Sequence, residues 1–134
     1  MCKMLLLFSH ELTEEQKEDA KRSLHVDGFV RLPDELQGLW QNIPPEKPSL
    51  LALLAPIRRW VKASAKRGDF VLIQGDFGAT YIMVNYCFSL GLNPVYATTE
   101  RKVTERLLAD DTVKTERIFK HRIFRRYEKE GYDE

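Results

Sequence analysis

The sequence predicts an α/β fold in which helices cover both faces of a mostly parallel sheet. Apolar runs at residues 3–8 and 70–73 are typical of strands that are buried on both faces. Segments of helical length separate these runs, so strands and helices alternate along the chain. A length of 134 residues suits one domain, and we assign residues 1–134 to it.

Local signals delimit the helices and the remaining strands. Thr13 and Gln16 form a predicted capping box, and Ser49 is placed to cap a later helix that contains Pro56. Helices are expected at 14–24, 33–41, 50–66, 77–90 and, as a short amphipathic one, about 100–109. Further strands are expected at 29–32 and 94–97, with one or two outer strands in the tail at 113–127.

The expected helix at 77–90 is apolar on nearly every side. It holds Tyr81, Ile82, Met83, Val84, Tyr86, Cys87, Phe88 and Leu90. A helix that is apolar all round is normally buried all round, and the sheet covers only one side of it. A partner subunit is one candidate for the other side, so the pattern favours a homodimer.

Composition argues against several classes of function. The formal net charge is +1, which does not suit a surface that coats long nucleic acid. Cys2 and Cys87 lack C-x-x-C spacing, and no cluster of His, Cys or carboxylates has metal-ligand spacing, so we expect no metal and no other cofactor. The same cysteine usage suits the reducing cytoplasm. No apolar segment approaches the roughly 20 residues that cross a bilayer, so we expect no membrane contact.

Polar clusters follow three of the expected strands. These clusters are Ser9 to Glu11, Gln74 to Asp76, and Thr98 to Arg101. In an open parallel sheet, ligands bind beyond the carboxyl ends of the strands. If the three strands are adjacent and parallel, the clusters share one edge of the sheet and predict a binding site there.

The turn after the central strand has features of an anion site. Gly75 and Gly78 let the backbone approach a ligand closely, and the N–H groups of Phe77, Gly78 and Ala79 open a helix. Asp76 has two interpretations, a simple N-cap of that helix or a functional carboxylate.

The other two clusters also have a structural and a functional interpretation. His10 either hydrogen-bonds its own turn or shuttles a proton beside a ligand-binding Ser9. Thr98, Thr99 and Arg101 either cap a helix on the surface or bind an anion, Arg101 through its bidentate fork.

Seven Lys or Arg residues lie between 113 and 129, with His121 and Arg122 among the residues of this run. Such a run is usually a solvated face. It would otherwise form a basic wall for a polyanionic ligand.

The sequence resembles the small stand-alone ring nucleases of type III CRISPR systems. The most specific part is Gln-Gly-Asp-Phe-Gly-Ala at 74–79, followed by Pro-Val-Tyr-Ala-Thr-Thr-Glu-Arg at 94–101. The opening Leu-Leu-Phe-Ser-His, the Leu-Thr-Glu-Glu-Gln after it, and Leu32-Pro33 with Trp40 are similar too. The resemblance spans most of the chain and is weakest after about residue 110.

This resemblance implies a Rossmann-type, CARF-like domain that acts as a homodimer. It implies binding of cyclic tetra-adenylate, the second messenger of the type III effector complex. It also implies metal-independent cleavage, by in-line attack of a ribose 2′-hydroxyl, to linear di-adenylate with a 2′,3′-cyclic phosphate. That reaction switches off ancillary nucleases.

We therefore expect catalysis by His10, Asp76 and Arg101. Ligand contacts are expected from Ser9, Gln74, Gly75, Phe77, Gly78, Ala79, Thr98, Thr99, His121 and Arg122. None of the three clusters contains a lysine, so charge stabilisation would fall to Arg101 or the tail. Two alternatives stay open: a non-catalytic sensor or sponge of the same fold, and a plain interaction module.

Overall fold

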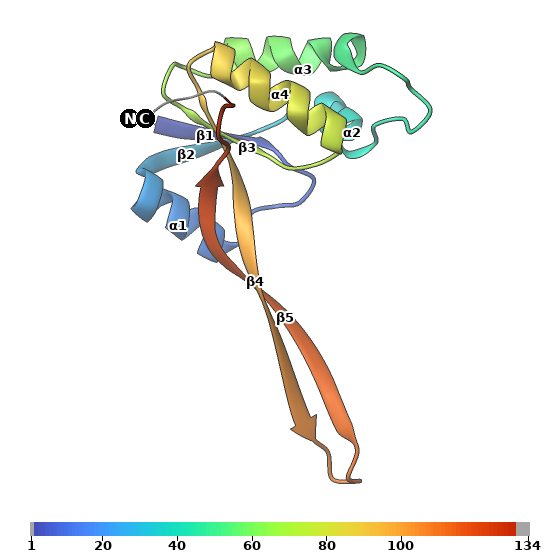
Figure 1. The fold of residues 1–134 in the computed structure, drawn as a ribbon. Helices are drawn as coiled ribbons and strands as arrows, with labels where there is room; N and C mark the ends of the chain where they lie inside the picture. The colour runs from blue at the N-terminus through green and yellow to red at the C-terminus, as the bar shows by residue number, and fades with distance from the viewer. Residues whose placement is uncertain (1, 131–134) are drawn as a thin grey trace.

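The computed structural model describes residues 2–130, apart from the side chain of Arg117, and confirms the α/β fold (Figure 1). In chain order the elements are β1 (Cys2–Leu7), α1 (Glu14–Leu24), β2 (Val26–Arg31), α2 (Asp34–Gln41), α3 (Leu51–Ser64), β3 (Phe70–Ile73), α4 (Phe77–Ser89), β4 (Asn93–Leu107) and β5 (Val113–Arg126). The strands form one sheet in the order β2-β1-β3-β4-β5.

The sheet is parallel except at one edge. β1 pairs with both β2 and β3, and β3 pairs with β4, all in parallel. Only β5 runs antiparallel, beside β4. Its presence confirms the outer strand expected from the tail.

Helices cover both faces of the sheet (Figure 1). On one face Ala20 of α1 joins Met4 and Leu72 in a buried cluster. On the other face α3 and α4 pack with Leu5 and Ile73 in a second, larger cluster. Successive strand residues thus point into opposite apolar layers, which explains the continuous apolar runs of β1 and β3.

Helix ends follow their local chemistry in most places. The capping box of Thr13 and Gln16 is confirmed, with both reciprocal hydrogen bonds present. The cap expected from Ser49 is wrong, because α3 begins after Leu50 and has no side-chain cap. Gly91 ends α4 with φ at +72°, a conformation that glycine adopts without strain.

The helix expected at about 100–109 is wrong. β4 continues through this segment to Leu107 and pairs with β5 along its whole outer half. We call residues 99–121 the arm. Figure 1 shows it projecting from the sheet as a two-stranded ribbon.

The helix α4 is not buried all round within one chain. Ala79, Met83 and Cys87 are buried against the sheet and α3. Phe77 is 95% exposed and Tyr81, one turn later, is 71% exposed. The single chain therefore leaves one side of α4 uncovered. The sequence argument for a homodimer assumed that this side is buried, and the single chain does not bury it.

The turn after β3 tolerates no larger residue at Gly75. A Cβ atom there would lie 2.9 Å from Nε1 of the buried Trp40 and 3.0 Å from two of its ring carbons. Gly75→Ala should therefore lower the free energy of unfolding by about 1–3 kcal/mol, measured by urea denaturation. Gly38→Ala is the control, since that site in α2 is open and alanine favours a helix by about 0.5–1 kcal/mol. Equal stability of Gly75→Ala and the parent would contradict this packing.

Candidate functional site

Two chain segments separate at the carboxyl edge of the sheet. Leu7 pairs with Ile73 near the ends of β1 and β3, and the N–H of Gln74 donates to the carbonyl of Leu7 at 3.1 Å. From there β1 leads to α1 on one face and β3 leads to α4 on the other (Figure 1). Such a switch point is where open α/β sheets bind ligands.

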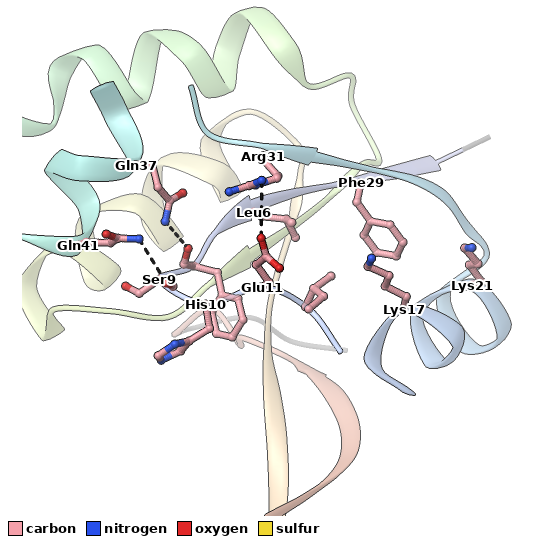
Figure 2. Close-up of a pocket in the computed structure, with 12 residues that line it drawn as sticks. Leu6, Ser9, His10, Glu11, Lys17, Lys21, Phe29, Arg31, Gln37 and Gln41 are labelled. Carbon is pink, nitrogen blue, oxygen red and sulfur yellow. Dashed lines mark hydrogen bonds and ion pairs between the residues drawn. The ribbon is translucent and has the colours of Figure 1, made fainter. Parts of the chain in front are cut away.

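A pocket of about 580 Å³ lies beside the loop after β1 (Figure 2). Its wall is formed by that loop, by α1, by the end of β2 and by α2, through Leu6, Phe8, Ser9, His10, Glu11, Leu12, Lys17, Lys21, Phe29, Arg31, Gln37 and Gln41. Its volume falls within the range of small-molecule sites.

Two amides of α2 fix the loop after β1. Nε2 of Gln37 donates to the carbonyl of Phe8 at 2.8 Å, and Nε2 of Gln41 donates to the carbonyl of Ser9 at 3.3 Å. The loop backbone is therefore held in place before any ligand arrives, which lowers the entropy cost of binding.

The pocket is positive overall. Lys17, Lys21 and Arg31 face it with a single carboxylate, Glu11 (Figure 2). Nη1 of Arg31 lies 3.9 Å from Oε1 of Glu11, and Nζ of Lys17 lies 3.5 Å from Oε1 of the exposed Glu14. Lys21 forms no ion pair with any residue between 2 and 130. This charge pattern suits an anionic ligand.

Aromatic rings complete the lining of the pocket. Phe8, His10 and Phe29 all contribute to it, and the rings of Phe8 and His10 meet edge to face at 5.5 Å. Flat apolar surface beside three cations fits a ligand that combines a planar ring with phosphate groups.

The turn after β3 joins neighbouring elements and also faces solvent. Oε1 of Gln74 accepts the N–H of Ala97 at 2.7 Å, which leaves only its Nε2 for a ligand. Asp76 is the N-cap of α4, as its Oδ2 accepts the N–H of Ala79 at 3.0 Å. Gly78 and Asp76 also line a second hollow of about 520 Å³ beneath the loop at 43–51.

The third cluster continues out of the sheet edge into β4. The hydroxyl of Thr98 is engaged with the backbone of Ile123 at a register shift between the two outer strands. Arg101 lies on the arm, where its guanidinium stands over the ring of Phe119. Arg101 lies four residues further along β4 than Ala97, roughly 13 Å of strand. Within one chain Arg101 is thus not part of the pocket.

His121 and Arg122 lie at the base of the arm. Nε2 of His121 contacts Oδ2 of Asp19 in α1 at 2.7 Å, and both side chains are buried. Nδ1 of His121 is buried without a hydrogen-bond partner among the residues described. Arg122 pairs with Glu100 at 3.4 Å. The contact between Asp19 and His121 anchors the arm to α1, whereas the pair of Arg122 and Glu100 joins the two outer strands.

Sequence reasoning missed the cations and amides of the pocket. Lys17 and Lys21 lie one turn apart on the same side of α1, a spacing that could have signalled a basic face. Arg31 lies within the strand expected at 29–32, and its sequence neighbours do not distinguish it from other surface arginines. Only the parallel pairing of β1 with β2 brings it beside the loop at Ser9.

Residues 2–130 offer neither a reactive cysteine nor a metal site. Burial raises the pKa of the Cys87 thiol to about 12, so this group is a poor nucleophile. No three His, Cys, Asp or Glu side chains of that range are grouped so as to hold a metal ion. In the same range, none of the helices combines the length and the apolar character that a membrane span requires.

Comparison with known proteins adds a family. Residues 2–125 match the model described as the Uncharacterized protein MJ1673 family. The chain belongs to this family. A protein of Methanocaldococcus jannaschii with the name Uncharacterized protein MJ1673 is 50% identical over 127 residues, which cover 95% of this chain and 98% of that protein. No solved structure matches.

The family match extends through nearly all of β5, so the arm is part of the family unit rather than an addition to it. Neither the family description nor the name of the relative states a ligand or an activity.

The link between Asp19 and His121 predicts a pH-dependent stability. Burial disfavours the charged carboxylate, but hydrogen bonds from Ser23 and His121, with the charges of His121 and Arg22, outweigh it and lower the pKa of Asp19 below 3.8. Because the pKa of Asp19 is lower in the folded chain than in the unfolded chain, the carboxylate stabilises the fold at pH values above the unfolded pKa. This stabilisation is lost as the pH falls through the folded pKa.

Asp19→Asn should thus cost about 1.5–3 kcal/mol of unfolding free energy at pH 7, and the difference from the parent should shrink below about pH 4. Urea denaturation at pH 7 and pH 3 measures both values. Asp27→Asn removes an exposed carboxylate and serves as the control. A cost for Asp19→Asn that matches the control at pH 7 would contradict the link.

Proposed function

We propose that this protein is a ring nuclease that binds cyclic tetra-adenylate and cleaves it without a metal. The observation that carries the proposal is the positive, aromatic-lined pocket beside the switch point of the sheet. The resemblance of residues 74–79 and 94–101 to ring nucleases suggests which ligand this is. Cyclic tetra-adenylate combines adenine rings with phosphates, which suit the aromatic and cationic residues of the pocket.

The pocket offers a partner for each part of an adenylate unit. Lys21, which has no ion-pair partner among residues 2–130, would hold a phosphate together with Lys17 and Arg31. Phe8 or Phe29 would pack against the base. These contacts would fix the ribose near the loop that carries Ser9 and His10.

A second phosphate would lie at the start of α4. The N–H groups of Phe77 and Gly78 precede the first hydrogen bonds of that helix and are exposed in the turn. The near-complete exposure of Phe77 leaves its ring free to stack on another base.

The cleavage step depends mainly on the alignment of the ribose 2′-oxygen with the adjacent phosphorus. The ribose 2′-oxygen attacks the adjacent phosphorus while the 5′-oxygen of the next unit leaves, which forms a 2′,3′-cyclic phosphate. The 2′-hydroxyl loses a proton and the 5′-oxygen gains one. Two such cuts convert the ring to two linear di-adenylates, and correct alignment alone supplies much of the rate.

We assign these proton transfers to two side chains, which line different hollows of the single chain. His10 is exposed at the mouth of the pocket and would donate to the leaving 5′-oxygen. Asp76 uses Oδ2 as the helix cap, so Oδ1 would accept the 2′-hydroxyl proton or orient that group. The pocket cations would stabilise the developing phosphate charge, the role first given to Arg101.

The symmetry of the ligand suggests two copies of the chain. A ring of four equivalent units has a two-fold axis, so a homodimer would place one half in each pocket. Each copy then contributes the same residues to one of the two cuts.

The test is incubation of the purified protein with cyclic tetra-adenylate in EDTA, followed by chromatography of the products. We expect conversion to linear di-adenylate with a 2′,3′-cyclic phosphate. Tight binding without turnover would favour a sensor or sponge of the same fold instead. Absence of binding would leave only an interaction module and would refute the proposal.

Pairs of variants, one inside the pocket and one outside it, test whether the activity depends on the pocket. His10→Asn should reduce turnover by about 10²-fold or more, whereas His25→Asn at the end of α1 should not. Lys21→Ala should weaken binding by about tenfold, whereas Lys62→Ala on the exposed side of α3 should not. Activity that is unchanged in both pocket variants would place the active site elsewhere.

A further inference from the structure

The cations of this chain are unevenly distributed. The formal net charge is only +1, yet residues 50–68 contain five Lys or Arg and no carboxylate. We call these five residues, Arg58, Arg59, Lys62, Lys66 and Arg67, the basic end of α3. The balancing carboxylates lie elsewhere, since residues 11–46 contain nine Asp or Glu against four Lys or Arg. The separation creates a local positive potential that the net charge conceals.

Stabilisation of the helix accounts for only part of this charge. Cations interact favourably with the helix dipole when they lie in the last turn. Lys62 meets this condition, because α3 ends at Ser64. Arg58 and Arg59 lie more than one turn before that end, and Lys66 and Arg67 lie beyond it.

The basic end of α3 has no counter-ion of its own. None of its five cations forms an ion pair with any of the residues that the structure describes. The next carboxylate along the chain, Asp69, is buried and already bound. Its Oδ2 accepts the N–H of Lys66 at 2.8 Å and lies 3.2 Å from Nζ of Lys3. The positive charge thus faces solvent without compensation.

Arg58 is held in position before any partner arrives. Its Cζ lies 4.3 Å from the centre of the Tyr86 ring in α4. Its Nε is buried and finds no hydrogen-bond acceptor among residues 2–130. A guanidinium that is stacked on a ring loses little freedom when its fork binds the two oxygens of a phosphate. The geometry therefore suits an anion at this position.

A hollow of about 500 Å³ adjoins the basic end of α3 at Arg67. Figure 1 shows α3 ending on the side of the sheet where β1 begins, the edge opposite the pocket beside Ser9. Arg67 lies against the backbone of Gly91 in this hollow, where a Cβ atom would be 2.9 Å from its Cγ. Arg126 and the half-buried rings of Phe88 and Tyr127 also line the hollow.

We propose that the basic end of α3 and this hollow bind a short single strand of nucleic acid. Arg58 and Lys62 lie one helical turn apart, about 6 Å along the axis, and contact neighbouring phosphates. The phosphate of a further nucleotide lies between Arg67 and Arg126, and its base packs against Phe88 or Tyr127. RNA and DNA share this chemistry, so both should bind.

Other polyanions fit this surface less well. A helix that lies on a membrane inserts large apolar side chains between its cations, but Ile57 and Val61 are fully buried in the core. The bases of a duplex are paired and stacked, so none can enter the hollow. An acidic peptide would satisfy the cations without using the two rings. The surface is separate from the pocket beside Ser9, so the proposal stands whether or not the protein cleaves a cyclic nucleotide.

Fluorescence anisotropy with labelled oligothymidylate and oligouridylate of about twelve nucleotides provides the first test. We expect a dissociation constant of about 10⁻⁴–10⁻⁶ M at physiological salt. The slope of log K against log salt should be about −3.5, as expected for about five phosphate contacts on a single strand. Inorganic polyphosphate and polyglutamate of similar charge should compete about tenfold more weakly, because they carry no bases. Anionic vesicles should not displace the strand.

Variants with equal changes of charge test the location of the site. Arg59→Ala combined with Lys62→Ala removes two exposed cations and should weaken binding about tenfold, with a slope shallower by about 1.4. Lys102→Ala combined with Lys114→Ala removes two cations of the arm and should leave both values unchanged, as should Lys21→Ala in the pocket. Circular dichroism confirms the fold of each variant.

Three results would overturn the proposal. The first is the absence of binding by the parent. The second is equal competition by polyphosphate, polyglutamate or vesicles, which would assign the surface to another partner. The third is a loss of affinity in the arm variant or in Lys21→Ala as large as that in the α3 variant.

Discussion

One residue at the end of the central strand holds the carboxyl edge together. The N–H of Gln74 donates to Leu7 of β1 at 3.1 Å, its carbonyl accepts Nε1 of Trp40 in α2 at 3.0 Å, and its Oε1 accepts the N–H of Ala97 in β4 at 2.7 Å. Gln74 thus holds β1, α2 and β4 together. The loop after β1, the turn into α4 and the base of the arm all start close to this residue.

The helix α1 connects the pocket with the arm. Its lysines Lys17 and Lys21 line the pocket, while Asp19 binds His121 at the base of the arm. A change in the position of this helix would therefore move the pocket cations and the arm together. This connection gives a physical route by which a contact made by the arm would affect the binding of an anionic ligand.

The sequence predicted those parts of the structure that local chemistry determines. Buried apolar runs identified β1 and β3, and the capping box identified α1. The segment at 100–109 was misread because its alternating charges and spaced apolar residues also suit a helix, and only pairing with β5, distant in sequence, decides its structure. The pocket cations were missed for the same reason, since strand pairing and helix packing assemble them from separate segments.

The central claim is that an anionic ligand binds where β1 and β3 separate. Amide chemical-shift mapping of ¹⁵N-labelled protein during titration with cyclic tetra-adenylate tests it most directly. The account predicts the largest shifts at 8–12 and 74–79, together with Lys17 and Lys21. Shifts confined to the opposite edge of the sheet, at the hollow beside Arg67 and Arg126, would contradict it.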